Sequence, residues 1–73
     1  MMTLPAGVNR TLMVTLDKDL CLSLIKFDND GNEYLALENN NDEEFIILGP
    51  ARRSTIRALQ FCLDRIAVHC VHD

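Results

Sequence analysis

The chain of 73 residues is poor in positive charge, has no long apolar run and contains only three cysteines. Seven lysines and arginines stand against eleven aspartates and glutamates, and the net charge of −4 argues against a phosphate-binding surface spread over the whole molecule. The longest apolar run, residues 45–48, is far shorter than the ~18 residues that cross a membrane. Because the cysteines are odd in number and no signal peptide is recognisable, we expect a reduced protein of the cytoplasm.

The sequence also lacks a recognisable catalytic or metal centre. Its two histidines, His69 and His72, lie at the extreme C-terminus, where a scaffold rarely holds a side chain firmly enough for catalysis. A zinc site would need ligands that converge, whereas Cys62 and Cys70 share one helical stripe from which His69 points away. The glycine of residues 28–33 is fourth in its segment, not sixth as in a calcium loop. We therefore expect no enzyme, no metal and no cofactor, and we interpret both cysteines as core thiols.

Residues 54–71 have the clearest periodicity in the chain and predict an amphipathic helix. Five residues recur at helical spacing and form one apolar stripe: Ile56, Leu59, Leu63, Ile66 and Cys70. We expect Leu63, at the centre of this stripe, to be buried against a sheet. Gly49 and Pro50 mark a break before the helix, which begins either at Pro50 or after a Ser54 cap.

Four segments before the helix have the patterns of β-strands: residues 10–16, 20–27, 33–38 and 43–48. Leu12 and Val14 share one face of the first strand. We expect Leu35 and Leu37 of the third strand to point toward the core and Glu38 to lie nearer solvent. Polar turns join the strands. The pattern predicts an α+β fold, a four-stranded antiparallel β-meander covered on one face by a single C-terminal α-helix (ββββα), as one domain over residues 10–73.

A single helix covers only one face of such a sheet, so the other face needs a different cover. That face carries Met13, Cys21, Ile25 and Phe27, which are too apolar for a face in solvent. We expect the N-terminal residues, a partner protein or a second copy of the chain to lie there.

Residues 1–9 have no periodicity and predict a flexible N-terminal arm. Leu4, Pro5 and Val8 offer apolar contacts to a partner, and Arg10 offers a charge for a carboxylate. An extended segment beside a sheet edge can recruit a partner chain by backbone pairing. The arm is therefore one candidate partner-binding site.

Arginines and one aromatic residue form a second candidate partner-binding site. Arg52, Arg53 and Arg57 cluster near the start of the helix, where cations oppose the helix dipole. They either recognise a phosphate or carboxylate or balance the acidic residues just upstream. Phe61, flanked by Arg57 and Arg65, lies away from the stripe and has the composition of an interface anchor.

Residues 45–66, FIILGPARRSTIRALQFCLDRI, comprise a strand, a Gly-Pro break and a helix. They resemble the end of the single-stranded-DNA-binding transcriptional coactivators, a dimeric family with the ββββα order. This resemblance implies a dimeric single-stranded nucleic-acid-binding module. The family carries basic and aromatic groups on its strands, whereas the second strand here offers Lys26 and Phe27 and the third is acidic.

In its length, its acidic balance and its opening residues MMTLPAGVNRTLMVTLDKD, the chain also resembles the small RNA-polymerase-binding transcription regulators of Xanthomonas phages. This resemblance implies binding to the N-terminal part of the largest subunit of host RNA polymerase. It also implies inhibition of initiation at host promoters and read-through of terminators. For the chain itself we expect a monomer or a weak homodimer. An acidic, non-catalytic module with spare apolar surface suits docking on a large basic machine.

Overall fold

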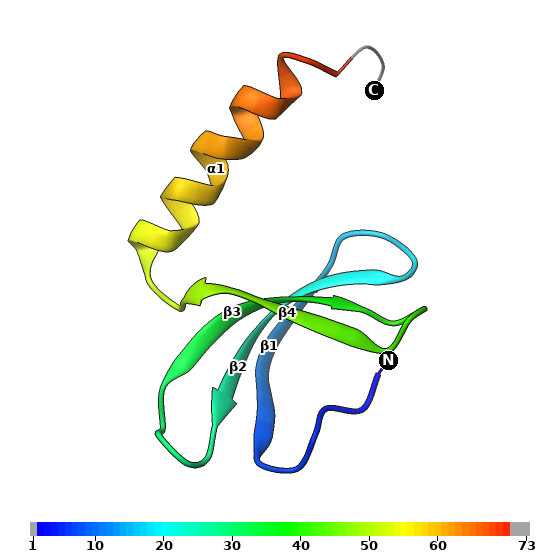
Figure 1. Ribbon diagram of the computed structural model, residues 1–73, viewed down its shortest axis with the longest axis vertical. Coiled ribbons are helices and arrows are strands. Elements are labelled where there is room, and N and C mark those ends of the chain that lie inside the picture. Colours follow the sequence, from blue (N-terminus) through cyan, green and yellow to red (C-terminus); the bar gives the residue numbers. More distant parts are fainter. Residues whose placement is uncertain (1, 71–73) are drawn as a thin grey trace.

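The computed structural model describes residues 2–70 and consists of one antiparallel sheet and one helix (Figure 1). The elements are β1 (Val8–Thr15), β2 (Leu20–Phe27), β3 (Glu33–Asn39), β4 (Glu44–Pro50) and α1 (Arg53–Ala67). The strands pair in the order β1-β2-β3-β4, each antiparallel to the next. The predicted ββββα order and antiparallel meander are confirmed. Within residues 2–70, no helix is both long enough and apolar enough to cross a membrane.

The ends of the strands follow from the turns and from the free edges of the sheet. β1 begins at Val8, so the last two residues of the expected arm belong to the sheet. In the turn between β2 and β3, Gly31 has a φ of +70° and donates its N–H to the carbonyl of Phe27 at 2.9 Å. β4 continues to Pro50, which has no backbone N–H to donate. An edge strand such as β4 tolerates a proline because one side of the strand has no neighbouring strand to pair with.

The register assigns the side chains to two faces, because residues directly opposite each other in a sheet point to the same side. The first face consists of two rows of aliphatic residues, and we call it the leucine face: Leu12, Val14, Leu22, Leu24, Leu35, Leu37 and Ile46. The second we call the core face: Arg10, Met13, Cys21, Ser23, Ile25, Tyr34, Ala36, Glu38, Phe45 and Ile47.

The core of the protein lies on the core face. Ile25 and Ala36 are fully buried and Cys21 is nearly so, whereas Leu12 and Val14 on the leucine face are more than half exposed. Register shifts in β1 and between β3 and β4 increase the local bend and twist of the sheet. The leucine face was expected to be the principal core surface. Leu35 is buried there and Leu37 is half-buried, but Leu12, Val14 and Ile46 are exposed, so the expectation is wrong for this part of the face.

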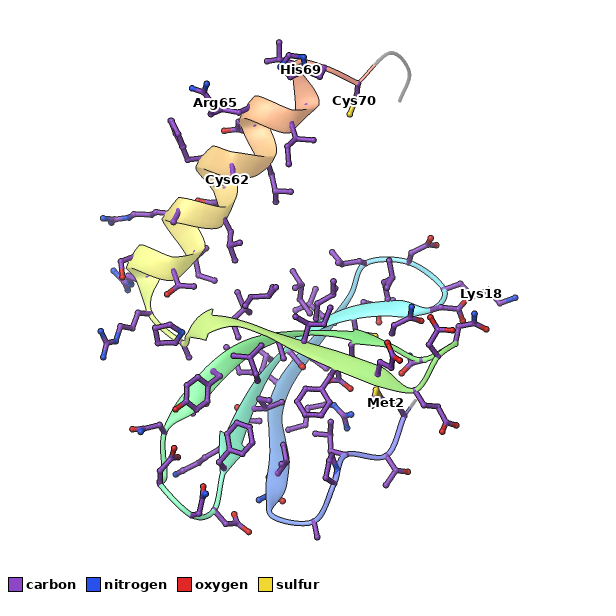
Figure 2. All side chains as sticks on the ribbon, viewed as in Figure 1. Met2, Lys18, Cys62, Arg65, His69 and Cys70 are labelled. Carbon is purple, nitrogen blue, oxygen red and sulfur yellow. The ribbon has the colours of Figure 1, made fainter. Side chains whose placement is uncertain are left out.

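The N-terminal segment covers the core face. Met2 is only 7% exposed, and its backbone N–H donates to Oδ1 of Asn40 at 2.9 Å. Its carbonyl accepts a hydrogen bond from Nη2 of Arg10 at 3.1 Å. In Figure 2, Met2 lies on the side of the sheet opposite α1. The segment therefore supplies the additional cover that the apolar second face required.

A buried ion pair joins β1 to β3 on the core face. Arg10 donates from Nε to Oε2 of Glu38 at 2.8 Å and from Nη2 to Oε1 at 2.5 Å, a two-point fork. Glu38 is fully buried, so its predicted place near solvent is wrong. The hydrogen bonds from Arg10 lower the pKa of Glu38 despite its burial, and the same bonds raise the pKa of Arg10. The nearby hydroxyl of Ser23 is buried without a hydrogen-bond partner among residues 2–70.

α1 does not cover the sheet. It rises away from the strands, and none of its fifteen residues is buried (Figure 1). Leu63 is 62% exposed and Cys62 is also exposed, which corrects their expected places in the core. The physical reason is that periodicity fixes which residues share a helical face but not whether that face meets its own sheet.

The start of α1 is fixed by its connection to β4. The helix begins at Arg53 with Arg52 as its N-cap residue, which makes no side-chain cap, so both expected starting points are wrong. The N–H of Ala51 donates to the carbonyl of Glu33 at 3.1 Å, which ties the connection to β3. A Cβ atom on Gly49 would lie 2.9 Å from Cγ2 of Thr55, so there is no room for a larger side chain at position 49 beside the first turn of α1.

Candidate partner-binding surfaces

An open groove separates the leucine face from the beginning of α1. Its volume is about 430 Å³, and it is lined by residues of both elements: Leu12, Val14, Leu22, Ser23, Leu24, Leu35, Ala51, Arg52, Arg53 and Ile56. Most of these side chains are aliphatic. Figure 2 shows the side chains of the sheet rising into the space on the helix side. Exposed apolar surface of this kind is typical of a binding site for another protein chain.

The inner side of α1 continues this apolar surface. Ile56 lies in the groove, and helical spacing places three more aliphatic residues on the same side, so we define the helical stripe as Ile56, Leu59, Leu63 and Ile66. Leu63 and Ile66 are each more than half exposed. Cys70, the fifth member of the predicted stripe, lies beyond the end of the helix at Ala67 and is exposed.

The outer side of α1 carries the predicted interface anchor. Phe61 is 63% exposed, and the guanidinium of Arg65 lies over its ring at 5.7 Å from the ring centroid. Arg57 lies one turn before Phe61 on the same side. The structure thus stacks Arg65 on Phe61 and places Arg57 on the same side of the helix, and all three side chains remain exposed.

The arginines at the start of the helix lie at the edge of the groove. Arg52 and Arg53 are exposed and line it, while Arg57 points to the outer side of the helix one turn later. The first turn of α1 contains no acidic residue. The positive end of the helix dipole and these cations therefore reinforce each other, which favours an anionic group of a partner at this position.

The arm residues are separated from the helical candidates by the sheet. Met2 and its neighbours lie against the core face, whereas α1 rises from the other side (Figure 1). Leu4 and Val8 are half-buried and Pro5 is exposed. Arg10, which was expected to meet a carboxylate of a partner, is committed to Glu38 within the chain. The predicted site residues therefore form two separate surfaces, not one.

The groove itself was not predicted as a binding site. The sequence indicated the leucine face and the helical stripe, but each was interpreted as half of one intramolecular core. Within residues 2–70, no three histidine, cysteine, aspartate or glutamate residues are grouped as metal ligands would be, and His72 lies outside this range. Comparisons of the chain with protein-family models, with curated proteins and with solved structures found no match.

Proposed function

We propose that this protein is a non-enzymatic, phage-encoded transcription regulator that binds host RNA polymerase in the host cytoplasm, at the N-terminal part of the largest subunit. The observation that supports a protein-binding role is the free helix, which exposes Phe61 and its flanking arginines well away from the sheet. The resemblance of the whole chain to phage regulators supplies the identity of the partner. Inhibition of initiation at host promoters and read-through of terminators belong to the same proposal.

The outer side of α1 is suited to anchor such a complex. Phe61 can enter an apolar pocket of the partner, and the arginine stacked on its ring adds charge at the rim. Aromatic and arginine residues are the types most often found to dominate interface energies. The net charge of −4 favours approach to a basic surface, with a rate that falls as salt rises.

The N-terminal arm offers a second candidate surface for contact with the partner. Leu4, Pro5 and Val8 retain exposed atoms beside β1, which is an edge strand and can pair with an extended segment of a partner. Because Met2 is buried and hydrogen-bonded, deleting the arm should lower stability as well as binding, so a deletion is a poor test of binding.

A single substitution tests the proposal more cleanly. The affinity of the chain for the isolated N-terminal part of the polymerase largest subunit is measured by titration calorimetry for the wild type, Phe61→Ala and Lys18→Ala. Lys18 is an exposed residue of the β1–β2 turn, far from α1 (Figure 2), and serves as the control. We expect Phe61→Ala to weaken binding by about 30-fold, as for an interface anchor, and Lys18→Ala to have no effect. Absence of wild-type binding would refute the polymerase proposal.

A dimeric coactivator-like module that binds single-stranded nucleic acid remains the second candidate. The observation in its favour is the pair Arg52 and Arg53 at the edge of the groove. The leucine face, however, offers no aromatic ring on which a base could stack. Tight binding of a labelled single-stranded oligonucleotide, with a steep loss of affinity between low and moderate salt, would favour this candidate over the regulator.

A further inference from the structure

Two uncovered apolar surfaces of matching length occur in the same chain. The leucine face runs across four strands, which at a spacing of about 4.8 Å between neighbouring strands gives about 14 Å. The helical stripe runs from Ile56 to Ile66, which is about 15 Å along the helix axis. Helix-on-sheet packing normally buries such surfaces against each other, whereas here Leu12, Val14 and Ile46 of the sheet and Leu63 and Ile66 of the helix are more than half exposed.

The exposed area and the radius of gyration of the chain are both larger than those of a compact monomer of the same size. The chain exposes 5761 Å², whereas a folded monomer of its 8.3 kDa mass exposes about 4,600 Å². The excess is therefore roughly 1,200 Å², more than the ~800 Å² that each partner buries in a standard interface. The radius of gyration of 13.5 Å likewise exceeds the ~11 Å of a compact domain of this length.

The helix is not arranged to close on its own sheet. Thr55 lies so near Gly49 that a Cβ atom on Gly49 would meet its methyl group at 2.9 Å, and the connecting residue Ala51 donates its N–H to the carbonyl of Glu33 at 3.1 Å. Both features tie the connection between β4 and α1 to the sheet. In this arrangement the helical stripe lies off the leucine face of its own chain.

Because α1 packs on no other element, it also lacks the tertiary contacts that normally stabilise a helix of this length. Helices of fifteen residues or fewer are marginal in water unless an amphipathic face is packed. α1 has no side-chain N-cap, has arginines at its start and buries none of its residues. A surface that accepts the helical stripe would supply the missing stabilisation.

We propose that the chain forms a two-fold symmetric dimer in which α1 of each copy packs its helical stripe on the leucine face of the other copy. The second copy is the favoured occupant because it carries both surfaces, so one symmetric contact made twice covers the helix and the sheet of both chains. No other component is needed. The excess exposed area is sufficient for an interface of the size that stable dimers use.

The dimer goes beyond the proposed polymerase binding and is independent of it. Phe61 and Arg65 lie on the side of α1 opposite the helical stripe, so they stay exposed when the stripe is covered. Polymerase binding and self-association therefore use different sides of one helix, and a variant on either side separates the two.

Sedimentation velocity of the purified chain between about 1 and 100 µM tests the dimer, since interfaces of this size bind with micromolar or tighter affinity. We expect the wild type to become dimeric across this range, with helical circular dichroism rising in parallel. Leu63→Glu should weaken association by at least about 100-fold, because the charge enters an apolar contact made twice. Phe61→Glu is the matched control, since the two side chains are equally exposed on opposite sides of the helix.

Mixing two defective chains identifies the contact surfaces. Leu63→Glu carries a defective helix and an intact sheet, whereas Val14→Glu carries a defective leucine face and an intact helix. Each alone should be monomeric, and the mixture should form heterodimers through the one intact helix–sheet contact. Val14 is an exposed residue of an edge strand, and Leu12→Glu is a second variant of the same face should Val14→Glu fail to fold. A wild type that remains monomeric at 100 µM, equal loss of dimer in Phe61→Glu, or a mixture that stays monomeric would overturn the proposal.

Discussion

Replacement of Arg10 by methionine will leave the buried carboxylate of Glu38 without its charge partner. Glu38 is fully buried, and its carboxylate accepts two hydrogen bonds from the guanidinium of Arg10. Removing one member of a buried pair costs about 3–5 kcal/mol, because the other charge stays desolvated. A chain of 73 residues has a total stability of about 4–11 kcal/mol, so Arg10→Met should remove a large part of it.

The same substitution should reverse the pH dependence of stability. In the wild type, hydrogen bonds from Arg10 lower the pKa of Glu38, so the folded chain binds fewer protons than the unfolded chain in acid. The contribution of Glu38 is then complete above the ordinary glutamate pKa of about 4.3 and is lost as pH falls through the lowered pKa. In Arg10→Met, burial becomes the largest influence on Glu38 and raises its pKa, so stability should increase as pH falls from 7.

Urea denaturation followed by circular dichroism, at pH 7 and pH 5 and at one dilute protein concentration, measures both effects. The control is the double variant Arg10→Met with Glu38→Met, which removes the pair together. It should recover most of the lost stability, because an apolar pair needs no desolvation. A loss below about 1 kcal/mol in Arg10→Met, or equal losses at the two pH values, would show that the pair is not buried as described.

Three further substitutions test the placement of α1 and of the core. In dilute solution, Leu63→Ala should change the unfolding free energy by less than about 0.5 kcal/mol, since the side chain is 62% exposed. Ile25→Ala, at a fully buried site, should cost about 2–5 kcal/mol in the same urea assay; similar values for the two would place the core on the wrong face. Gly49→Ala should cost about 1–3 kcal/mol, because the added Cβ meets Thr55, and an unchanged thermal midpoint would rule out that close contact.

The sequence was sufficient for the order and type of the elements but not for their packing. Alternation in β1 and turn residues such as Gly31 act locally, so they predict strands and turns without knowledge of the rest of the fold. The periodicity of α1 likewise predicts a helix. It does not state which surface the stripe meets, and the connection before α1 is tied to the sheet by the hydrogen bond from Ala51 to Glu33, two residues far apart in the sequence.

The buried ion pair shows a second limit of the sequence. Arg10 and Glu38 each look like ordinary polar residues of an alternating strand, and the pairing register of three strands is needed to bring them together. Of the candidate site residues, Phe61 and Arg65 could be paired from helical spacing alone, because their contact is local. The groove could not be predicted in this way, because it exists only where the leucine face and the helical stripe, which were expected to pack on each other, stay apart.

Amide hydrogen exchange of the dilute chain, alone and with the isolated N-terminal part of the polymerase largest subunit, tests whether α1 is a free helix that a partner protein covers. We predict that amides of α1 exchange fast in the free chain and become protected in the complex, while those of β2 and β3 are protected in both. Strong protection of α1 in the dilute free chain would show that the helix is not free, and unchanged exchange in α1 on addition of the polymerase fragment would show that this partner does not cover it.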